Sequence, residues 1–129
     1  MSRYRNIHCF IWNDDKFPFL SDNCQLLFFH LLTTPLSTPM GIYVASLEGL
    51  AAEKRWSLKK YIQTFGEGLG KGFWKYDERF HVILFPQYFK YNQPANPNVL
   101  TSWIKHYIEI PDCLLKYESI QCLKTFAKD

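Results

Sequence analysis

Residues 57–85 read SLKKYIQTFGEGLGKGFWKYDERFHVILF, and this segment has the clearest structural pattern of the 129-residue chain. Ser57 is a good helix N-cap, because its side chain can accept a hydrogen bond from a backbone amide of the first turn. The i, i+4, i+7 and i+11 positions that follow are occupied by Leu58, Ile62, Phe65 and Leu69. This spacing predicts a helix whose apolar stripe is buried in the core.

The other face of this helix is expected to be basic and rich in hydrogen-bonding groups. It consists of Lys59, Lys60, Gln63, Thr64 and Glu67. Gly66, Gly68 and Gly70 each cost about 1 kcal/mol relative to Ala inside a helix, so we expect the C-terminal half to be weak. Gly72 is expected to end the helix as a C-cap.

Two strands joined by a hairpin are predicted after the helix. Residues 73–76 and 80–85 are rich in aromatic and β-branched side chains, and Asp77-Glu78-Arg79 between them is typical of a turn. Upstream, Ser21 and Ser46 are expected to cap helices over residues 20–34 and 47–54, with a short strand at 42–44 between them. The apolar face of the first helix is predicted to contain Cys24, Leu27, Phe28, Leu31 and Leu32.

The C-terminal part is expected to be a helical extension. Residues 93–98 contain two prolines and read as a linker. We therefore divide the chain into a domain over 1–92, a linker over 93–98 and an extension over 99–129 that packs on, or exchanges with, the domain. Helices are predicted at 99–108 and 112–127, the second with an apolar face formed by Cys113, Tyr117, Ile120, Leu123 and Phe126.

Composition indicates an ordinary globular protein. Hydrophobic residues make up 47% of the chain and charged residues 21%, which is enough apolar material for one core. The longest apolar run is far shorter than the roughly 20 residues of a membrane helix, and no signal peptide is evident. The four cysteines form no C-x-x-C pair, so we expect reduced thiols and a cytoplasmic location.

The net charge of +3 is unevenly distributed. Residues 54–90 carry eight basic and three acidic groups, whereas residues 1–53 carry three and five. The order helix, strand, helix, helix, hairpin is that of a winged helix-turn-helix, so the fold class expected is α+β, mainly helical, with a small β-hairpin wing and added C-terminal helices. Because the basic excess coincides with the recognition helix and wing, the candidate DNA-binding residues are Arg55, Lys59, Lys60, Gln63, Thr64, Lys75 and Arg79.

Several short segments, in their order and spacing, are also familiar. They are Arg3-Tyr4-Arg5, Ile11-Trp12-Asn13-Asp14, Lys16-Phe17, Leu20-Ser21, Leu26-Leu27-Phe28, Leu31-Leu32-Thr33, Gly41-Ile42-Tyr43, Lys75-Tyr76-Asp77, Phe89-Lys90-Tyr91-Asn92 and Asn96-Pro97-Asn98-Val99. Together they resemble the N-terminal winged-helix module of phage and prophage replication proteins, the replisome organisers. The module is similar to the N-terminal domain of DnaD-type primosomal proteins.

The resemblance implies a module that binds origin DNA or self-associates. The resemblance implies four partners, which are double-stranded DNA, single-stranded DNA, further copies of the chain and helicase-loading proteins. Gly66, Gly68 and Gly70 depart from the more regular helix of that family.

Catalytic and metal-binding chemistry have little support in the sequence. Residues 66–72 are glycine-rich, but they lack the Gly, Ser/Thr and preceding strand of a phosphate-binding loop. The His and Cys residues lack the short spacing of a zinc site, and His106 with Glu109 has no third partner. We therefore expect no catalytic, metal or cofactor-binding residues, no cofactor and no enzymatic activity.

Two alternatives to DNA binding stay open. The basic face can simply be a solvated surface, which is what a run of charges usually is. Alternatively, the winged helix can serve protein–protein interaction or oligomerisation in primosome or helicase-loader assembly, without direct DNA contact. For self-association the candidate residues are Leu26, Phe29 and Trp103, with Tyr4, Phe10, Trp12 and Tyr107 adding aromatic surface near the chain ends.

Overall fold

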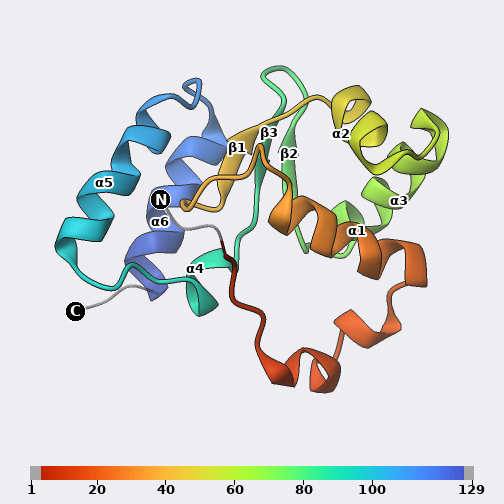
Figure 1. The fold of residues 1–129 in the computed structure, drawn as a ribbon, viewed down its shortest axis with the longest axis horizontal. Coiled ribbons are helices and arrows are strands. Elements are labelled where there is room, and N and C mark those ends of the chain that lie inside the picture. Colours follow the sequence, from red (N-terminus) through yellow and green to blue (C-terminus); the bar gives the residue numbers. More distant parts are fainter. Residues whose placement is uncertain (1–3, 127–129) are drawn as a thin grey trace.

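The computed structural model describes residues 4–126, in which helices predominate and a small sheet lies between two groups of them (Figure 1). The elements in chain order are the 3₁₀-helices η1 (Cys9–Asn13) and η2 (Phe17–Phe19), then α1 (Asp22–Thr33), β1 (Ile42–Val44), α2 (Leu47–Lys54), α3 (Leu58–Gly70), β2 (Lys75–Asp77), β3 (Val82–Leu84), α4 (Tyr88–Tyr91), α5 (Pro97–Ile108) and α6 (Leu114–Phe126). The expected α+β, mainly helical class is confirmed. No helix within residues 4–126 combines the length and apolar character needed to cross a bilayer.

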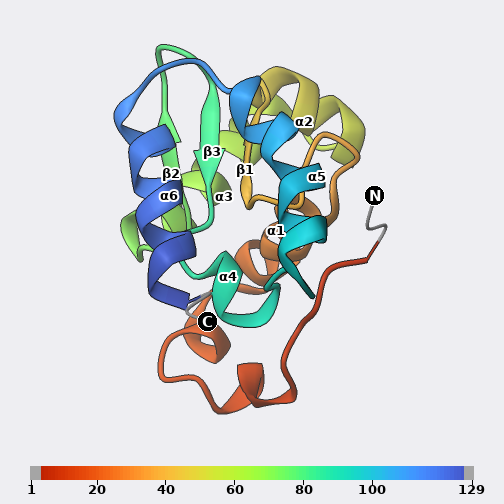
Figure 2. The ribbon, with the colours of Figure 1, turned by 90° about the vertical axis from the view of Figure 1, so that its left-hand side faces the viewer.

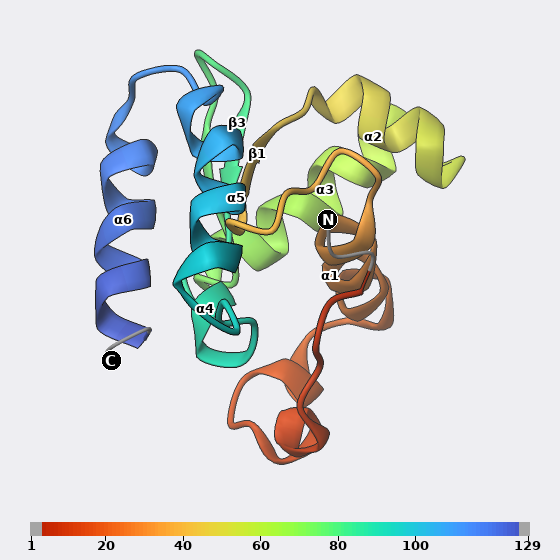
Figure 3. The same ribbon diagram turned by 60° about the vertical axis from the view of Figure 1, so that its left-hand side comes forward.

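The sheet is antiparallel, with β3 in the centre and the order β1-β3-β2. Leu84 of β3 lies opposite Ile42 on one side and Lys75 on the other. Helices α1, α2 and α3 lie on one side of the sheet, and α5 and α6 lie on the other (Figures 1 and 3). Viewed from the side of α5 and α6, these two helices stand in front of the strands (Figure 2).

The helix starts follow the capping residues closely. The side chains of Ser21, Ser46 and Ser57 accept hydrogen bonds from the third residue after each of them, as N-caps do. Helix α2 has the predicted bounds, and Gly72 at φ +82° follows the end of α3. Helix α5 begins at residue 97, earlier than predicted, because Asn96 caps it and a proline is well tolerated in the first turn.

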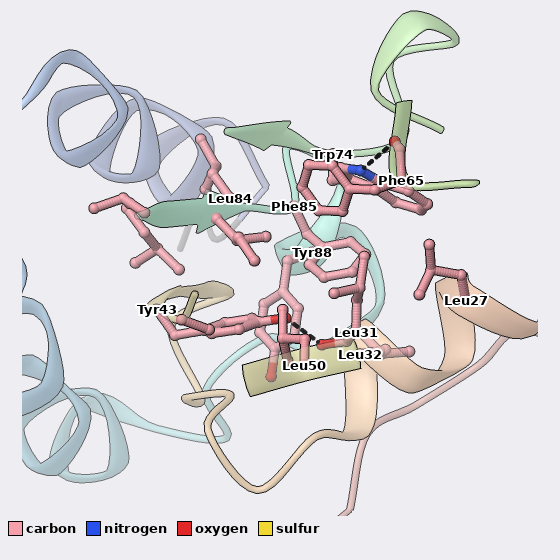
Figure 4. Close-up of a cluster of buried hydrophobic side chains, with 14 of the residues drawn as sticks. Leu27, Leu31, Leu32, Tyr43, Leu50, Phe65, Trp74, Leu84, Phe85 and Tyr88 are labelled. Carbon is pink, nitrogen blue, oxygen red and sulfur yellow. Dashed lines mark hydrogen bonds between the residues drawn. The ribbon is translucent and has the colours of Figure 1, made fainter. Parts of the chain in front are cut away.

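The core is filled by aromatic and leucine side chains between α1, α3 and the sheet (Figure 4). Tyr43 donates a hydrogen bond to the carbonyl of Leu31 over 2.7 Å, and Trp74 Nε1 donates to the carbonyl of Phe65 over 3.1 Å. These bonds satisfy the polar atoms of two fully buried rings. The predicted face of α1 is buried, except that Phe28 is only partly so.

The prediction for α3 was wrong about the face that is buried. Leu58, Ile62 and Leu69 are 41%, 47% and 40% exposed, and only Phe65 of the predicted stripe is buried. The buried residues are Tyr61, Thr64, Phe65 and Gly68. The helix is turned this way because the Trp74 ring packs directly on Gly68, where any side chain would collide with it.

The face predicted for α6 was also only partly right. The buried residues of α6 are Leu115 and Ser119, whereas Tyr117 is well exposed. Cys113, Ile120, Leu123 and Phe126 are half-buried. The helix takes this orientation because it packs against β2, β3 and α4. Residue 127, the predicted last residue of this helix, lies outside the described residues, as does Arg3.

All four cysteines are unpaired, as expected. Cys9 is exposed, and burial raises the pKa of the Cys24 thiol to about 12.

Side-chain hydrogen bonds connect residues 4–8, upstream of η1, to the rest of the molecule. Asn6 bonds to both Asn92 and the carbonyl of Tyr91, and Arg5 donates to Ser37.

Candidate nucleic-acid interface

A tight turn joins α2 to α3 and presents a basic residue to solvent. Arg55 adopts a left-handed conformation at φ +64°, and its N–H donates to the carbonyls of Ala51 and Ala52. Trp56 N–H also donates to Ala51, after which Ser57 starts α3. A non-glycine residue at positive φ is strained, so this backbone fixes the angle at which α3 leaves α2.

The turn and the first half of α3 form a cationic segment. Residues 54–63 carry four basic residues and no acidic one. Lys59 and Gln63 lie one helical turn apart on the solvent face of α3, both exposed. Within residues 4–126 neither side chain has an intramolecular hydrogen-bond or ion-pair partner. These groups are therefore available to an anionic partner.

The Trp56 ring contacts the ammonium groups of two of the lysines. The Nζ atoms of Lys54 and Lys60 lie 4.8 and 4.2 Å from the centre of its ring, a cation–π arrangement. The indole itself packs edge-on against Tyr61 at 5.9 Å. Sequence reasoning missed Trp56, although a tryptophan set among four basic residues was the available signal.

Thr64 does not belong to the interface. Its side chain is only 7% exposed, and its Oγ1 donates to the carbonyl of Lys60 over 2.9 Å. It lies on the buried face of α3 with Tyr61 and Phe65, as a consequence of the rotation of the helix. The expectation that Thr64 approaches base edges is therefore corrected.

The two basic residues of the hairpin differ in their surroundings. Lys75 Nζ lies 2.6 Å from Glu118 Oε2 of α6, and both side chains are nearly half exposed. This pair partly neutralises the lysine. Arg79, in the loop between β2 and β3, is exposed and places its guanidinium 5.1 Å from the ring of Phe80. Unlike Lys75, Arg79 has no ion-pair partner among residues 4–126.

A hydrogen-bonded cluster joins the three helices beneath this surface. His30 of α1 bonds through Nδ1 to Tyr61 of α3 at 2.9 Å and through Nε2 to Glu53 of α2 at 2.7 Å. Thr34 donates to the same oxygen of Glu53 over 2.6 Å. Burial raises the pKa of Tyr61, which stays a neutral hydroxyl. Tyr61 is fully buried, and the cluster bonds α1, α2 and α3 to one another.

The three self-association candidates are not brought together as an exposed patch. Leu26 is exposed, but Phe29 packs edge-on against Phe17 and Phe28, and Trp103 is only 9% exposed. Trp103 cannot contact a partner without movement of α5. Most of the exposed aromatic residues within 4–126 lie near the N-terminus, at Tyr4, Phe10, Trp12 and Phe19, and the others are Tyr91 and Tyr117.

A hollow of about 720 Å³ separates this N-terminal segment from the body of the molecule. Its apolar lining includes Phe28 and Phe73, and Lys16, Lys71 and Lys90 are also among its lining residues. Asp14 and Asp15 line it as well, so its charge is mixed. Its chemistry favours no particular ligand.

Other predicted absences concern metal and phosphate sites. Among the described residues, no group of three or more His, Cys, Asp or Glu side chains could hold a metal ion. Residues 66–70 belong to α3, so the glycine-rich stretch is mostly helix rather than a loop.

Comparisons of the chain with protein-family models, with curated proteins and with solved structures found no match.

Proposed function

We propose that the chain is a winged-helix module that binds double-stranded DNA, with α3 as the recognition helix and the β2–β3 hairpin as the wing. The order of the elements and the β1-β3-β2 sheet support this assignment, because a winged helix has this arrangement. The observation that carries the proposal is the cationic segment 54–63, which lies on the opposite side of the sheet from α5 and α6 (Figure 1).

Phosphate contacts supply most of the binding free energy in this proposal. Lys59, Lys60 and Arg55 neutralise phosphates beside α3, and Arg79 does so from the wing. Lys75 contributes less, because Glu118 already balances its charge. Gln63 is the polar side chain placed to reach base edges. The cluster of His30, Glu53 and Tyr61 keeps the geometry of α1, α2 and α3 fixed while they bind.

The resemblance to phage and prophage replication proteins supports a role in replication initiation, as part of a replisome organiser. The proposed activity is binding without catalysis, so no cofactor is involved.

Fluorescence anisotropy with a labelled duplex tests the proposal at two salt concentrations. We predict that the parent binds with a log–log salt slope of roughly −0.9 per neutralised phosphate, and that Lys59→Glu/Lys60→Glu abolishes binding. The matched control is Lys105→Glu/Lys124→Glu, which makes the same change in net charge at exposed positions of α5 and α6. If the α3 reversal binds as the parent does, or if both double variants lose binding equally, α3 is not the DNA-binding helix.

A second function is favoured by a separate observation. Phe10, Trp12 and Phe19 are exposed on the N-terminal segment, and exposed aromatic patches are typical of protein-binding surfaces. The module can therefore also bind further copies of itself or helicase-loading proteins. Light scattering at tens of micromolar tests self-association, which a strict monomer would contradict.

A further inference from the structure

We propose that α3 selects A·T base pairs, with Gln63 bonding to adenine and Ile62 packing on the methyl group of thymine. This inference rests on the proposed function, since it concerns how the same helix reads duplex DNA. It depends on the observed orientation of α3, which exposes residues that the sequence pattern had assigned to the core.

The solvent face of α3 can be described position by position. Lys59 and Gly66 lie near its centre, and Ile62 and Gln63 lie on either side of the line between them. Ile62 is 47% exposed, and Gln63 is exposed without an intramolecular partner in residues 4–126. The two side chains that flank the centre of this face are therefore one apolar group and one primary amide.

Gly66 allows this face to approach a ligand closely. A Cβ atom built there would meet nothing within 4 Å, so the position is open to solvent. One turn before it, Ile62 and Gln63 project from the helix, and one turn after it, Gly70 is equally open. Along the centre of the face, the C-terminal half therefore presents only glycine backbone at Gly66 and Gly70. The side chains that flank it there are Leu69 on one edge and Glu67, bonded to Ser21, on the other.

The chemistry of these side chains distinguishes base pairs in the major groove. A glutamine amide can accept from adenine N6 and donate to adenine N7, and an apolar side chain can contact the C5 methyl of thymine. Guanine is most often read by an arginine or a lysine. The solvent face of α3 has no arginine, and the proposed function assigns Lys59, its central lysine, to a phosphate. Lys59 remains as a phosphate-binding cation. Gln63 and Ile62 together therefore match the groups that an A·T pair presents in the major groove.

The test uses base analogues in a duplex first identified by selection from random sequences. Deoxyuridine in place of thymidine removes only the methyl group, and 7-deazaadenine in place of adenine removes only the N7 acceptor. For the parent we expect the Kd to rise about fourfold for each contacted methyl group that is lost, from about 0.8 kcal/mol per buried carbon. A rise of similar size is expected for the lost N7 contact.

Two variants assign these losses to residues. Ile62→Ala should bind thymidine and deoxyuridine duplexes equally, and Gln63→Ala should bind adenine and 7-deazaadenine duplexes equally. Leu69→Ala is the matched control, because Leu69 is an exposed apolar residue near the end of the same helix. It should keep both discriminations. Thermal melts check that each variant is folded.

The outcomes separate this inference from the proposed function. Absence of salt-dependent duplex binding by the parent overturns both. Duplex binding that is equal for all analogues, or a selected site made of G·C pairs, overturns only the A·T readout. If Ile62→Ala keeps the discrimination of thymidine but alters self-association in light scattering, Ile62 binds protein rather than DNA, and the inference is also overturned.

Discussion

Gly68 shows how a single missing side chain sets the orientation of a helix. A Cβ atom at this position would lie 2.1 Å from Cη2 of Trp74, a separation that no packed structure tolerates. The indole is fully buried and its nitrogen is bonded to Phe65, so it has no room to retreat. Gly66, two residues earlier in the same helix, faces open space. Packing therefore requires a glycine at position 68 but not at position 66.

We predict opposite effects of alanine at these positions. Gly68→Ala should lower the free energy of unfolding by about 3 kcal/mol or prevent folding, because it overpacks the core. Gly66→Ala should raise it by about 0.5–1 kcal/mol, since alanine is the better helix former. Denaturant titrations followed by circular dichroism measure both. Equal effects of the two substitutions would contradict the observed orientation of α3.

At the scale of elements, hydrogen bonds of Glu67 connect α3 to the start of α1. Its carboxylate accepts from Ser21 N–H at 2.8 Å and from Ser21 Oγ at 2.6 Å. These bonds, first that of the side chain and then that of the backbone, hold the pKa of Glu67 below its ordinary value of 4.5. The negative charge also lies at the N-terminus of α1, where the helix dipole favours it. Both interactions are stronger for the ionised carboxylate.

The stability contributed by this contact should depend on pH. Because the pKa of Glu67 is lower in the folded chain than in the unfolded chain, the unfolded chain binds more protons. The contribution is thus present in full above about pH 4.5 and is lost as the pH falls through the folded-state pKa. Glu67→Gln should cost about 1 kcal/mol at pH 7, and this difference from the parent should shrink at pH 3.

Unfolding titrations at both pH values measure this difference, with Asp15→Asn as the control that removes one exposed carboxylate elsewhere. A deficit of Glu67→Gln that stays constant between pH 7 and pH 3 would show that the charge is not what stabilises the contact.

For the whole molecule, the central question is how the C-terminal helices complete the fold. Helix α6 covers β2, β3 and α4 on the side of the sheet away from α1 and α3 (Figures 1 and 2). The contact buries Leu115 and Ser119 and pairs Glu118 with Lys75. All three residues of β3 are buried, because helices lie on both faces of the sheet. The extension therefore shares one core with the preceding elements.

Two neighbouring leucines test this shared core. Leu115 is 8% exposed and Leu114 is 78% exposed. Leu115→Ala should cost about 2–4 kcal/mol and lower the midpoint of one cooperative transition, whereas Leu114→Ala should cost less than about 0.5 kcal/mol. Differential scanning calorimetry measures both. A separate early transition in the parent, or equal costs for the two variants, would contradict packing of α6 on the sheet.

The amino-acid sequence by itself determined where α1, α2 and α3 begin. Ser21, Ser46 and Ser57 mark helix starts because capping is a bond between residues three positions apart, which the local sequence contains. The cationic character of residues 54–63 also follows directly from the sequence. The hairpin and its order after α3 followed from local propensity and a turn signal.

The buried face of α1 followed from spacing, but only the tertiary structure decided which faces of α3 and α6 are buried. Spacing placed Leu58, Ile62 and Leu69 together, but it contained no information about the Trp74 ring that requires Gly68. Thr64 is buried for the same reason. The pairing of Lys75 with Glu118 joins residues 43 positions apart. Such contacts depend on the complementary shape and charge of distant segments, which periodicity along one helix does not specify.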